Sequence, residues 1–83
     1  MFYVYIAYFN SKFSIGVTVD LYRRIKLLRY QKNKNYKIVH YEEYTNSKEA
    51  AQRENELQDF STELIAELVL DNNPMMIDLL KKT

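Results

Sequence analysis

The sequence predicts an α+β domain, in which a three-stranded antiparallel sheet is flanked by helices in the order ββαβααα. Two observations predict it. Apolar runs of strand length stand at residues 2–9, 13–17 and 37–44, and the other apolar residues recur at the three- and four-residue spacing of amphipathic helices. With 83 residues, the chain is long enough for one small core, so we expect a single domain over residues 1–83.

The first run is expected to be a central strand, because apolar side chains occupy both of its alternating faces. One face would hold Phe2, Val4, Ile6 and Tyr8, and the other Tyr3, Tyr5 and Ala7. The dipeptide Asn10-Ser11 predicts a tight turn that leads into residues 13–17 as the partner strand of a hairpin.

The first helix is predicted to run from Thr18, as its N-cap, to about Tyr30. Asp20 would lie in the first turn, where the helix dipole favours a negative charge. The apolar stripe of this helix consists of Leu21, Ile25 and Leu28. Arg24 lies on the same stripe, so its charge is aimed toward the sheet.

The polar, lysine-rich residues 31–36 are expected to form a loop before the third strand. Asn46 with Glu49 three residues later resembles a capping box and predicts a helix that reaches about residue 60. Glu54 shares an edge with the apolar face of this helix, so its carboxylate is aimed near the core. The inward-facing residues would be Ala50, Ala51, Leu57 and Phe60.

Ser61 or Thr62 is expected to cap a third helix that ends at residues 71–73. Proline suits the first position of a helix, so Asn73-Pro74 predicts a last short helix. The apolar face of the third helix would consist of Leu64, Ile65, Leu68 and Val69.

Charge is unevenly distributed along the chain, although the net charge is only +1. Residues 1–45 hold eight Lys/Arg against three Asp/Glu, whereas residues 46–83 hold four against eight. A basic half suits a phosphate backbone. Solvated faces of ordinary helices explain the same pattern.

Composition also restricts the class of protein. The chain has no cysteine, which excludes disulfides and thiolate metal sites and favours a reducing, cytoplasmic compartment. No apolar run approaches the ~20 residues that span a bilayer, so we expect no membrane partner. The N-terminus leads directly into a strand without a basic segment, so we expect no signal peptide.

Arg24 and Glu54 are the main candidates for chemistry, because a charge that faces a core requires a partner or a ligand. One interpretation is a partly buried salt bridge between them, and periodicity alone favours it. The other is a hydrolytic site in which Glu54 holds a divalent cation and Arg24 holds a phosphate. His40, the only histidine, is interpreted as a packing or surface residue of its strand.

The order and spacing of several segments resemble the GIY-YIG nuclease superfamily, and in particular its small stand-alone YhbQ-like (URI domain) group. Tyr3-Val4-Tyr5 is similar to the GIY half of the motif, and Ser14-Ile15-Gly16 is similar to the YIG half. Residues 20–24, 39–44, 50–57 and 73–79 resemble further segments of the family, so the resemblance covers nearly the whole chain. It implies a GIY-YIG-like fold.

The resemblance also implies roles for individual residues. Tyr5 would place or deprotonate the attacking water, Arg24 would contact the scissile phosphate, and Glu54 would bind one Mg²⁺ or Mn²⁺ ion. Gly16 would allow close approach of the chain and the substrate, or it simply relieves crowding at the end of a strand. The partner would be branched or nicked DNA, bound without sequence preference in repair or recombination. The basic residues that would hold its backbone are Arg23, Lys26, Arg29, Lys32 and Lys34.

Several positions depart from the family pattern. Ser14 replaces the second tyrosine, and its hydroxyl is not a phenolic acid–base group. Phe13 cannot substitute for it, because alternation directs Phe13 to the opposite face. Leu28 stands where many members have a histidine. Residues that replace common tryptophans or basic residues are Gln58, Asp59, Phe60, Thr62, Ile65 and Met76.

Two functions therefore remain open. The retained Tyr5, Arg24 and Glu54 favour a metal-dependent DNA endonuclease or nickase with a partly degenerate active site. The alternative is a catalytically inactive module that binds nucleic acid or protein on the same scaffold. Ser14, Leu28 and the acidic second half of the chain favour this alternative.

Overall fold

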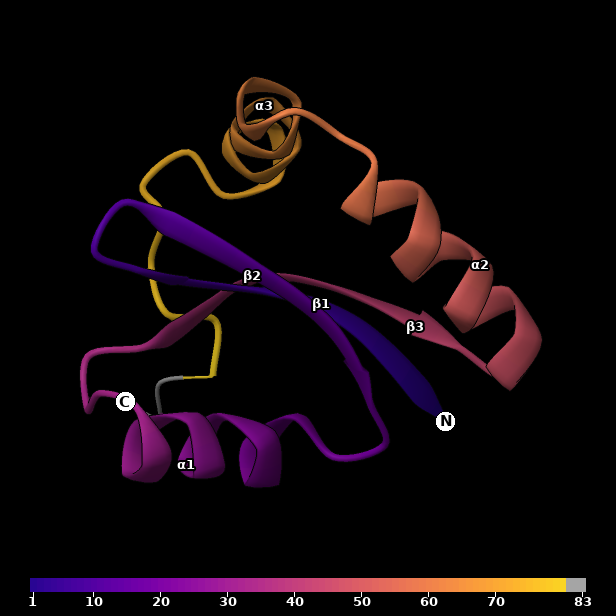
Figure 1. The fold of residues 1–83 in the computed structure, drawn as a ribbon, viewed down its shortest axis with the longest axis horizontal. Helices are drawn as coiled ribbons and strands as arrows, with labels where there is room; N and C mark the ends of the chain where they lie inside the picture. Colours follow the sequence, from indigo (N-terminus) through magenta and orange to yellow (C-terminus); the bar gives the residue numbers. More distant parts are fainter. Residues whose placement is uncertain (81–83) are drawn as a thin grey trace.

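The computed structural model describes residues 1–80 and has the α+β architecture that the sequence predicts. Its strands form one antiparallel sheet in the order β2-β1-β3. Helix α1 lies on one face of this sheet, and α2 and α3 lie on the other (Figure 1). The elements are β1 (Phe2–Phe9), β2 (Lys12–Thr18), α1 (Leu21–Gln31), β3 (Lys37–Tyr44), α2 (Ser47–Gln58) and α3 (Thr62–Asn72).

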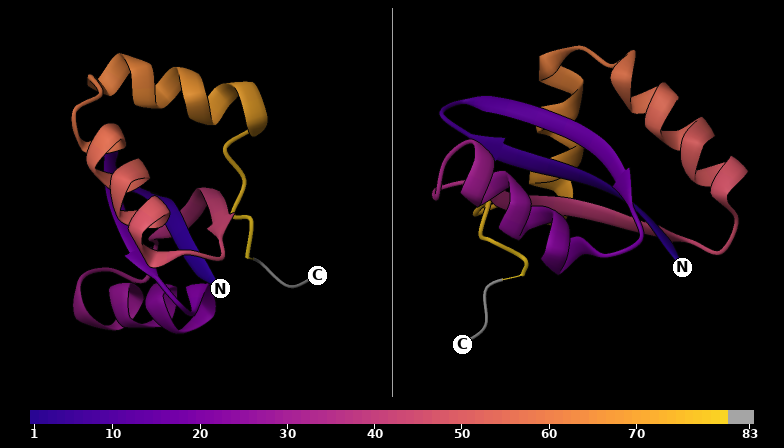
Figure 2. Two further views of the ribbon diagram at one scale, coloured as in Figure 1. Left: turned by 90° about the vertical axis from the view of Figure 1, so that its right-hand side faces the viewer. Right: turned by 60° about the horizontal axis from the view of Figure 1, so that its bottom comes forward.

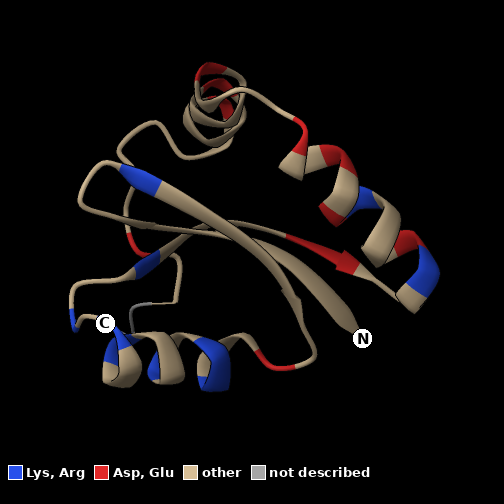
Figure 3. Cartoon of the chain, viewed as in Figure 1, with Lys and Arg blue, Asp and Glu red and all other residues tan. Residues whose placement is uncertain are grey.

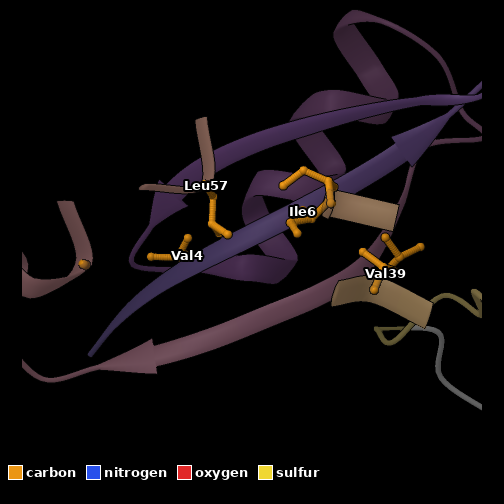
Figure 4. Packing of buried hydrophobic residues seen from close by; sticks show 7 residues of the cluster. Val4, Ile6, Val39 and Leu57 are labelled. Carbon is orange, nitrogen blue, oxygen red and sulfur yellow. The ribbon is translucent and has the colours of Figure 1, made fainter. Parts of the chain in front are cut away.

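The hydrophobic core has two parts because the central strand β1 is covered on both faces, as predicted. One part lies between the sheet and helices α2 and α3. In this part the Leu57 side chain of α2 points toward β1 (Figure 4). It contains Val4, Ile6, Val39, Ala50, Leu57, Ile65 and Val69. The part that lies against α1 contains Tyr5, Ala7, Leu21, Ile25 and Ile38.

The turn and the first helix start differ in detail from the prediction. Asn10 and Ser11 both have positive φ, 53° and 63°, which is the geometry of a two-residue hairpin turn that matches the strand twist. Thr18 remains in β2 and is not the helix cap. Asp20 is the N-cap instead, because its carboxylate accepts a hydrogen bond from the Arg23 amide at 3.0 Å.

The caps of α2 and α3 are those expected. The Asn46 side chain accepts hydrogen bonds from the amides of the first turn of α2, and the Ser61 hydroxyl accepts one from Leu64. Two residues predicted to face inward are exposed, namely Ala51 and Leu64. Ala51 directly follows the buried Ala50, and Leu64 directly precedes the buried Ile65. A step of one residue is a rotation of about 100° around a helix, so both side chains turn away from the core.

The short helix predicted after Asn73-Pro74 is absent from residues 1–80. Pro74 and Met75 form a turn, and the following segment extends along β3, where the Leu79 amide donates to the Ile38 carbonyl at 2.9 Å. The buried Asn73 side chain fixes the start of this segment, since it bonds both Val39 and Ile77. These contacts satisfy backbone groups that a helix would pair internally.

The C-terminal segment 73–80 connects the two helical layers that lie on opposite faces of the sheet. Figure 2 shows it leaving α3 on one side of the sheet and passing toward α1 on the other. There the Asp78 carboxylate pairs with the Arg29 guanidinium at 2.6 Å. Within residues 1–80 no helix is both long and apolar enough to cross a membrane.

Candidate active site

The candidate site is centred on the pairing of Tyr5 in β1 with Gly16 in β2. A Cβ atom placed on Gly16 would lie 2.5 Å from the Tyr5 hydroxyl oxygen and 2.7 Å from Cζ. The Tyr5 ring therefore passes directly over Gly16, and any larger residue would collide with it. Gly16 does not have positive φ, so the position requires space and not an unusual backbone. Of the two explanations for Gly16, the structure favours relief of crowding within the protein.

Tyr5 lies within electrostatic reach of both charged candidates. Its side chain is largely buried, and burial raises the pKa of the phenol above its ordinary value. The Arg24 guanidinium opposes this rise in pKa, and the Glu54 carboxylate adds to it. Tyr5 in β1, Arg24 in α1 and Glu54 in α2 are thus linked electrostatically, although no hydrogen bond or ion pair joins them.

Arg24 and Glu54 do not neutralise each other. Among residues 1–80 the ion pairs are Arg29–Asp78, His40–Glu42, Arg53–Glu42 and Arg53–Glu56. The salt bridge favoured by periodicity alone is therefore wrong. Both side chains are half-buried, and a half-buried charge without an ion partner favours an external ligand of opposite sign.

Glu54 is the residue that would hold a divalent cation. Residues 1–80 contain no group of three or more His, Cys, Asp or Glu side chains that could enclose a metal. Mg²⁺ does not need such a cage, because it commonly binds through one or two carboxylates together with water and substrate phosphates. A half-buried carboxylate without a cationic partner fits this mode of binding.

Ser14 lies on the same face of β2 as Gly16, opposite the small, buried Ala7. Phe13 and Ile15 project to the other face, where they pack against the cluster beneath α2 and α3. The second half of the motif thus places no phenol beside Tyr5. Leu28 packs against the core on the α1 face, which gives it a structural role.

The remaining motif residue, Tyr3, lies on the Tyr5 face of the sheet. Its ring meets the ring of Tyr41 edge to face, with the centroids 6.1 Å apart. Tyr3 thus helps to cover the sheet beside the site.

The predicted nucleic-acid-binding residues gather on the α1 side of the molecule, which carries most of the blue segments in Figure 3, whereas red segments dominate α2 and α3. Four of the five line one cleft of about 850 Å³, and Lys37, which was not predicted, joins them. They are Arg23, Lys26, Arg29 and Lys34. The exposed Lys32 is outside this lining, and so are Tyr5, Arg24 and Glu54.

Arg29 also has a structural role. In addition to its ion pair with Asp78, its Nε donates to the Tyr36 carbonyl at 2.9 Å. The side chain therefore ties α1 to the loop before β3 and to the C-terminal segment. Its charge is partly satisfied within the protein.

A second polar cluster, which the sequence analysis did not identify, connects β3 to α2. Burial alone would raise the pKa of Glu42, but hydrogen bonds from Arg53, His40 and Tyr44 outweigh it and lower the pKa to about 2. His40 is buried, as a packing residue would be. Alternation along β3 places residues 40, 42 and 44 on one face of the strand. This spacing was the sequence signal from which the cluster could have been predicted.

Comparisons of the chain with family models, with curated proteins and with solved structures found no match.

Proposed function

We propose that this domain is a metal-dependent phosphodiester hydrolase, a DNA endonuclease or nickase of the GIY-YIG kind. The observation that supports the proposal is the electrostatic influence of both Arg24 and Glu54, from two different helices, on the buried Tyr5 phenol. Neither Arg24 nor Glu54 makes an ion pair within residues 1–80, so both charges are available to a phosphate and a cation.

Each residue would have a distinct part in hydrolysis. The water oxygen bonds to phosphorus, the bond to the departing strand oxygen breaks, and that oxygen takes up a proton while the water gives one to solvent. Arg24 would stabilise the negative charge that develops on the nonbridging oxygens. Glu54 would hold a Mg²⁺ or Mn²⁺ ion, which acts as a Lewis acid on the phosphate when bound.

Tyr5 would orient the attacking water. Because burial raises the pKa of its phenol, the group is protonated at neutral pH and is a poor general base. The hydroxyl can still accept and donate hydrogen bonds. Of the two roles that the family resemblance implies for Tyr5, a protonated phenol is consistent with placement of the water.

A cleavage assay tests the proposal. End-labelled branched, nicked and plain duplex DNA are incubated with the protein in Mg²⁺ or Mn²⁺, and the wild type is compared with Glu54→Gln. The rate should fall by at least about 100-fold in this variant, since both metal binding and charge stabilisation are lost. The matched control is Glu43→Gln, which removes an exposed carboxylate of β3 and should leave the rate within about twofold. Equal inactivity of wild type and both variants on all substrates would refute the enzymatic proposal.

A second candidate function is a nucleic-acid-binding module without activity. One feature favours it: Ser14 supplies no phenol at the position of the second tyrosine. This function predicts DNA binding that is independent of Mg²⁺ and unchanged in Glu54→Gln. Calorimetric detection of Mn²⁺ binding that disappears in Glu54→Gln would count against it.

A further inference from the structure

We infer that α1 of one molecule packs against α3 of a second copy of this chain, so that the protein self-associates head to tail through two different helix faces. The two helices lie on opposite faces of the sheet (Figure 1), and each has a row of exposed side chains along its outward side. The inference is independent of the proposed hydrolysis, because it concerns only contacts between copies of the chain.

The charge of α3 is the first argument. This helix contains three carboxylates and no Lys or Arg. The carboxylates belong to Glu63, Glu67 and Asp71, which are four residues apart and form one exposed row. Like charges at this spacing destabilise a helix, and none of the three makes an ion pair with another residue among 1–80. A cationic partner would relieve their repulsion.

The outward side of α1 has the complementary charge. This helix contains four Lys or Arg residues and no carboxylate. Tyr22, Lys26 and Tyr30 form an exposed row with the same four-residue spacing, and the exposed Arg23 lies beside it. Neither Lys26 nor Arg23 has an ion partner in the described part of the chain. Rows at this spacing are the ridges that interdigitate when two helices pack, so these cations can lie between the carboxylates of α3.

Exposed apolar side chains border both charged rows. On α1, Leu27 and Tyr30 are 40% and 90% exposed, and on α3, Leu64 and Leu70 are 48% and 44% exposed. Apolar surface with a polar border is typical of protein–protein contacts. Packing of α1 on α3 would remove these side chains from water while the charges pair, so both effects favour the same contact.

The positions of the two helices determine the kind of assembly. The basic α1 and the acidic α3 are different surfaces on opposite sides of the molecule (Figure 3), so the contact is heterologous. It leaves one α1 and one α3 uncovered at the ends, and further copies can add in an open chain. Each helix has 11 residues, or about 16 Å of length. The contact is therefore small, and we expect it to be weak and reversible.

Sedimentation velocity of the full chain, freed of nucleic acid, tests this inference. At low salt the average sedimentation coefficient should rise between about 20 µM and about 1 mM protein without a plateau at the dimer, and about 0.5 M NaCl should return it toward the monomer value. Arg23→Glu/Lys26→Glu and Glu67→Lys/Asp71→Lys should each weaken association at least about tenfold, because each places like charges across the contact. An equimolar mixture of these two variants should associate again, since their reversed charges are complementary.

The matched control is Lys12→Glu/Lys48→Glu, which makes the same charge change as the α1 variant at two exposed lysines outside both helices. It should associate within about twofold of the wild type. Leu64→Ser/Leu70→Ser retains every charge and should weaken association at least about fivefold. The circular dichroism of every variant should match that of the wild type.

Four results would overturn the inference. They are a wild type that stays monomeric at all concentrations, a charge-reversed mixture that stays monomeric, a Lys12→Glu/Lys48→Glu control that dissociates as fully as the α1 variant, and unchanged association after removal of the two leucines. None of them bears on DNA cleavage, which is measured separately.

Discussion

At the scale of single residues, the contact between Tyr5 and Gly16 determines the geometry of the site. The Tyr5 ring is held against the backbone of the neighbouring strand because Gly16 has no side chain. This close approach fixes the hydroxyl position from which Tyr5 would place a water. The identity of both residues was visible in the sequence, but the cause was not, because they meet only when β1 and β2 pair.

The first prediction concerns this contact. Gly16→Ala should lower the free energy of unfolding by about 1–3 kcal/mol, because the new Cβ would lie within 2.5–2.9 Å of three Tyr5 atoms. In a Tyr5→Ala background the same substitution should cost far less, since the collision is removed. Urea unfolding of the four proteins in this cycle measures the coupling. Simple additivity of the two substitutions would contradict the described contact.

The second prediction concerns Ser14. Ser14→Tyr would place a phenol on the face of β2 that carries Gly16, opposite the small Ala7. If the missing phenol limits hydrolysis, this variant should cleave DNA at least about tenfold faster than the wild type. Ser14→Phe, which adds the ring without the hydroxyl, is the control and should give no increase. Equal rates for the two variants would show that the hydroxyl at this position does not limit the reaction.

At the scale of elements, two helix starts followed from sequence because the deciding interactions are local, whereas the start of α1 was mispredicted because Thr18 remains in β2 and Asp20 is the cap. Asn46 and Ser61 cap their helices with their own side chains, so the sequence predicted both starts. The end of the chain was mispredicted, because Pro74 suits a helix locally and distant residues decided otherwise. The Asp78 carboxylate meets Arg29, which is 49 positions earlier, and the Leu79 amide binds β3.

The third prediction belongs to the connection between β3 and α2. The Glu42 pKa is lowered from 4.5 to about 2 in the folded state, so Glu42 contributes stability above pH 4.5 that is lost as pH falls toward 2. Glu42→Gln should remove roughly 1–2 kcal/mol at neutral pH, because partial exposure screens the interactions of Glu42 with Arg53. The variant should also lose less stability than the wild type between pH 5 and pH 2.

Urea unfolding at a series of pH values checks this prediction, with Glu43→Gln as the neighbouring exposed control. The control should retain the pH dependence of the wild type. An identical acid profile for Glu42→Gln and the wild type would show that the cluster does not contribute through the Glu42 charge.

At the scale of the whole molecule, the fold places basic and acidic residues in different helical layers, on opposite faces of the sheet. The chain enters α1 on one face of the sheet and returns through β3 to α2 and α3 on the other, so the basic and acidic halves of the sequence become opposite sides (Figure 3). Under the proposed function, DNA would approach the α1 side. The sequence predicted the uneven charge, but the cleft depends on the C-terminal segment, whose position no local pattern indicated.

The electrostatic link among the three candidate residues also belongs to this scale. Arg24 and Glu54 lie on helices that cover opposite faces of the sheet, and both act on Tyr5. The apolar spacing of each helix predicted that Arg24 and Glu54 face inward. It did not predict that these two side chains make no ion pair with each other. That outcome excludes the structural salt bridge between Arg24 and Glu54.

The most direct test of this account is a Mn²⁺ titration followed by NMR, because bound Mn²⁺ broadens signals near it. The account predicts selective broadening of the Tyr5 ring and Arg24 guanidinium signals in the wild type, and none of this broadening in Glu54→Gln. It also predicts that Glu43→Gln behaves like the wild type. Broadening that persists in Glu54→Gln, or that centres on residues remote from Tyr5 and Arg24, would contradict the claim that these residues form one metal-dependent site.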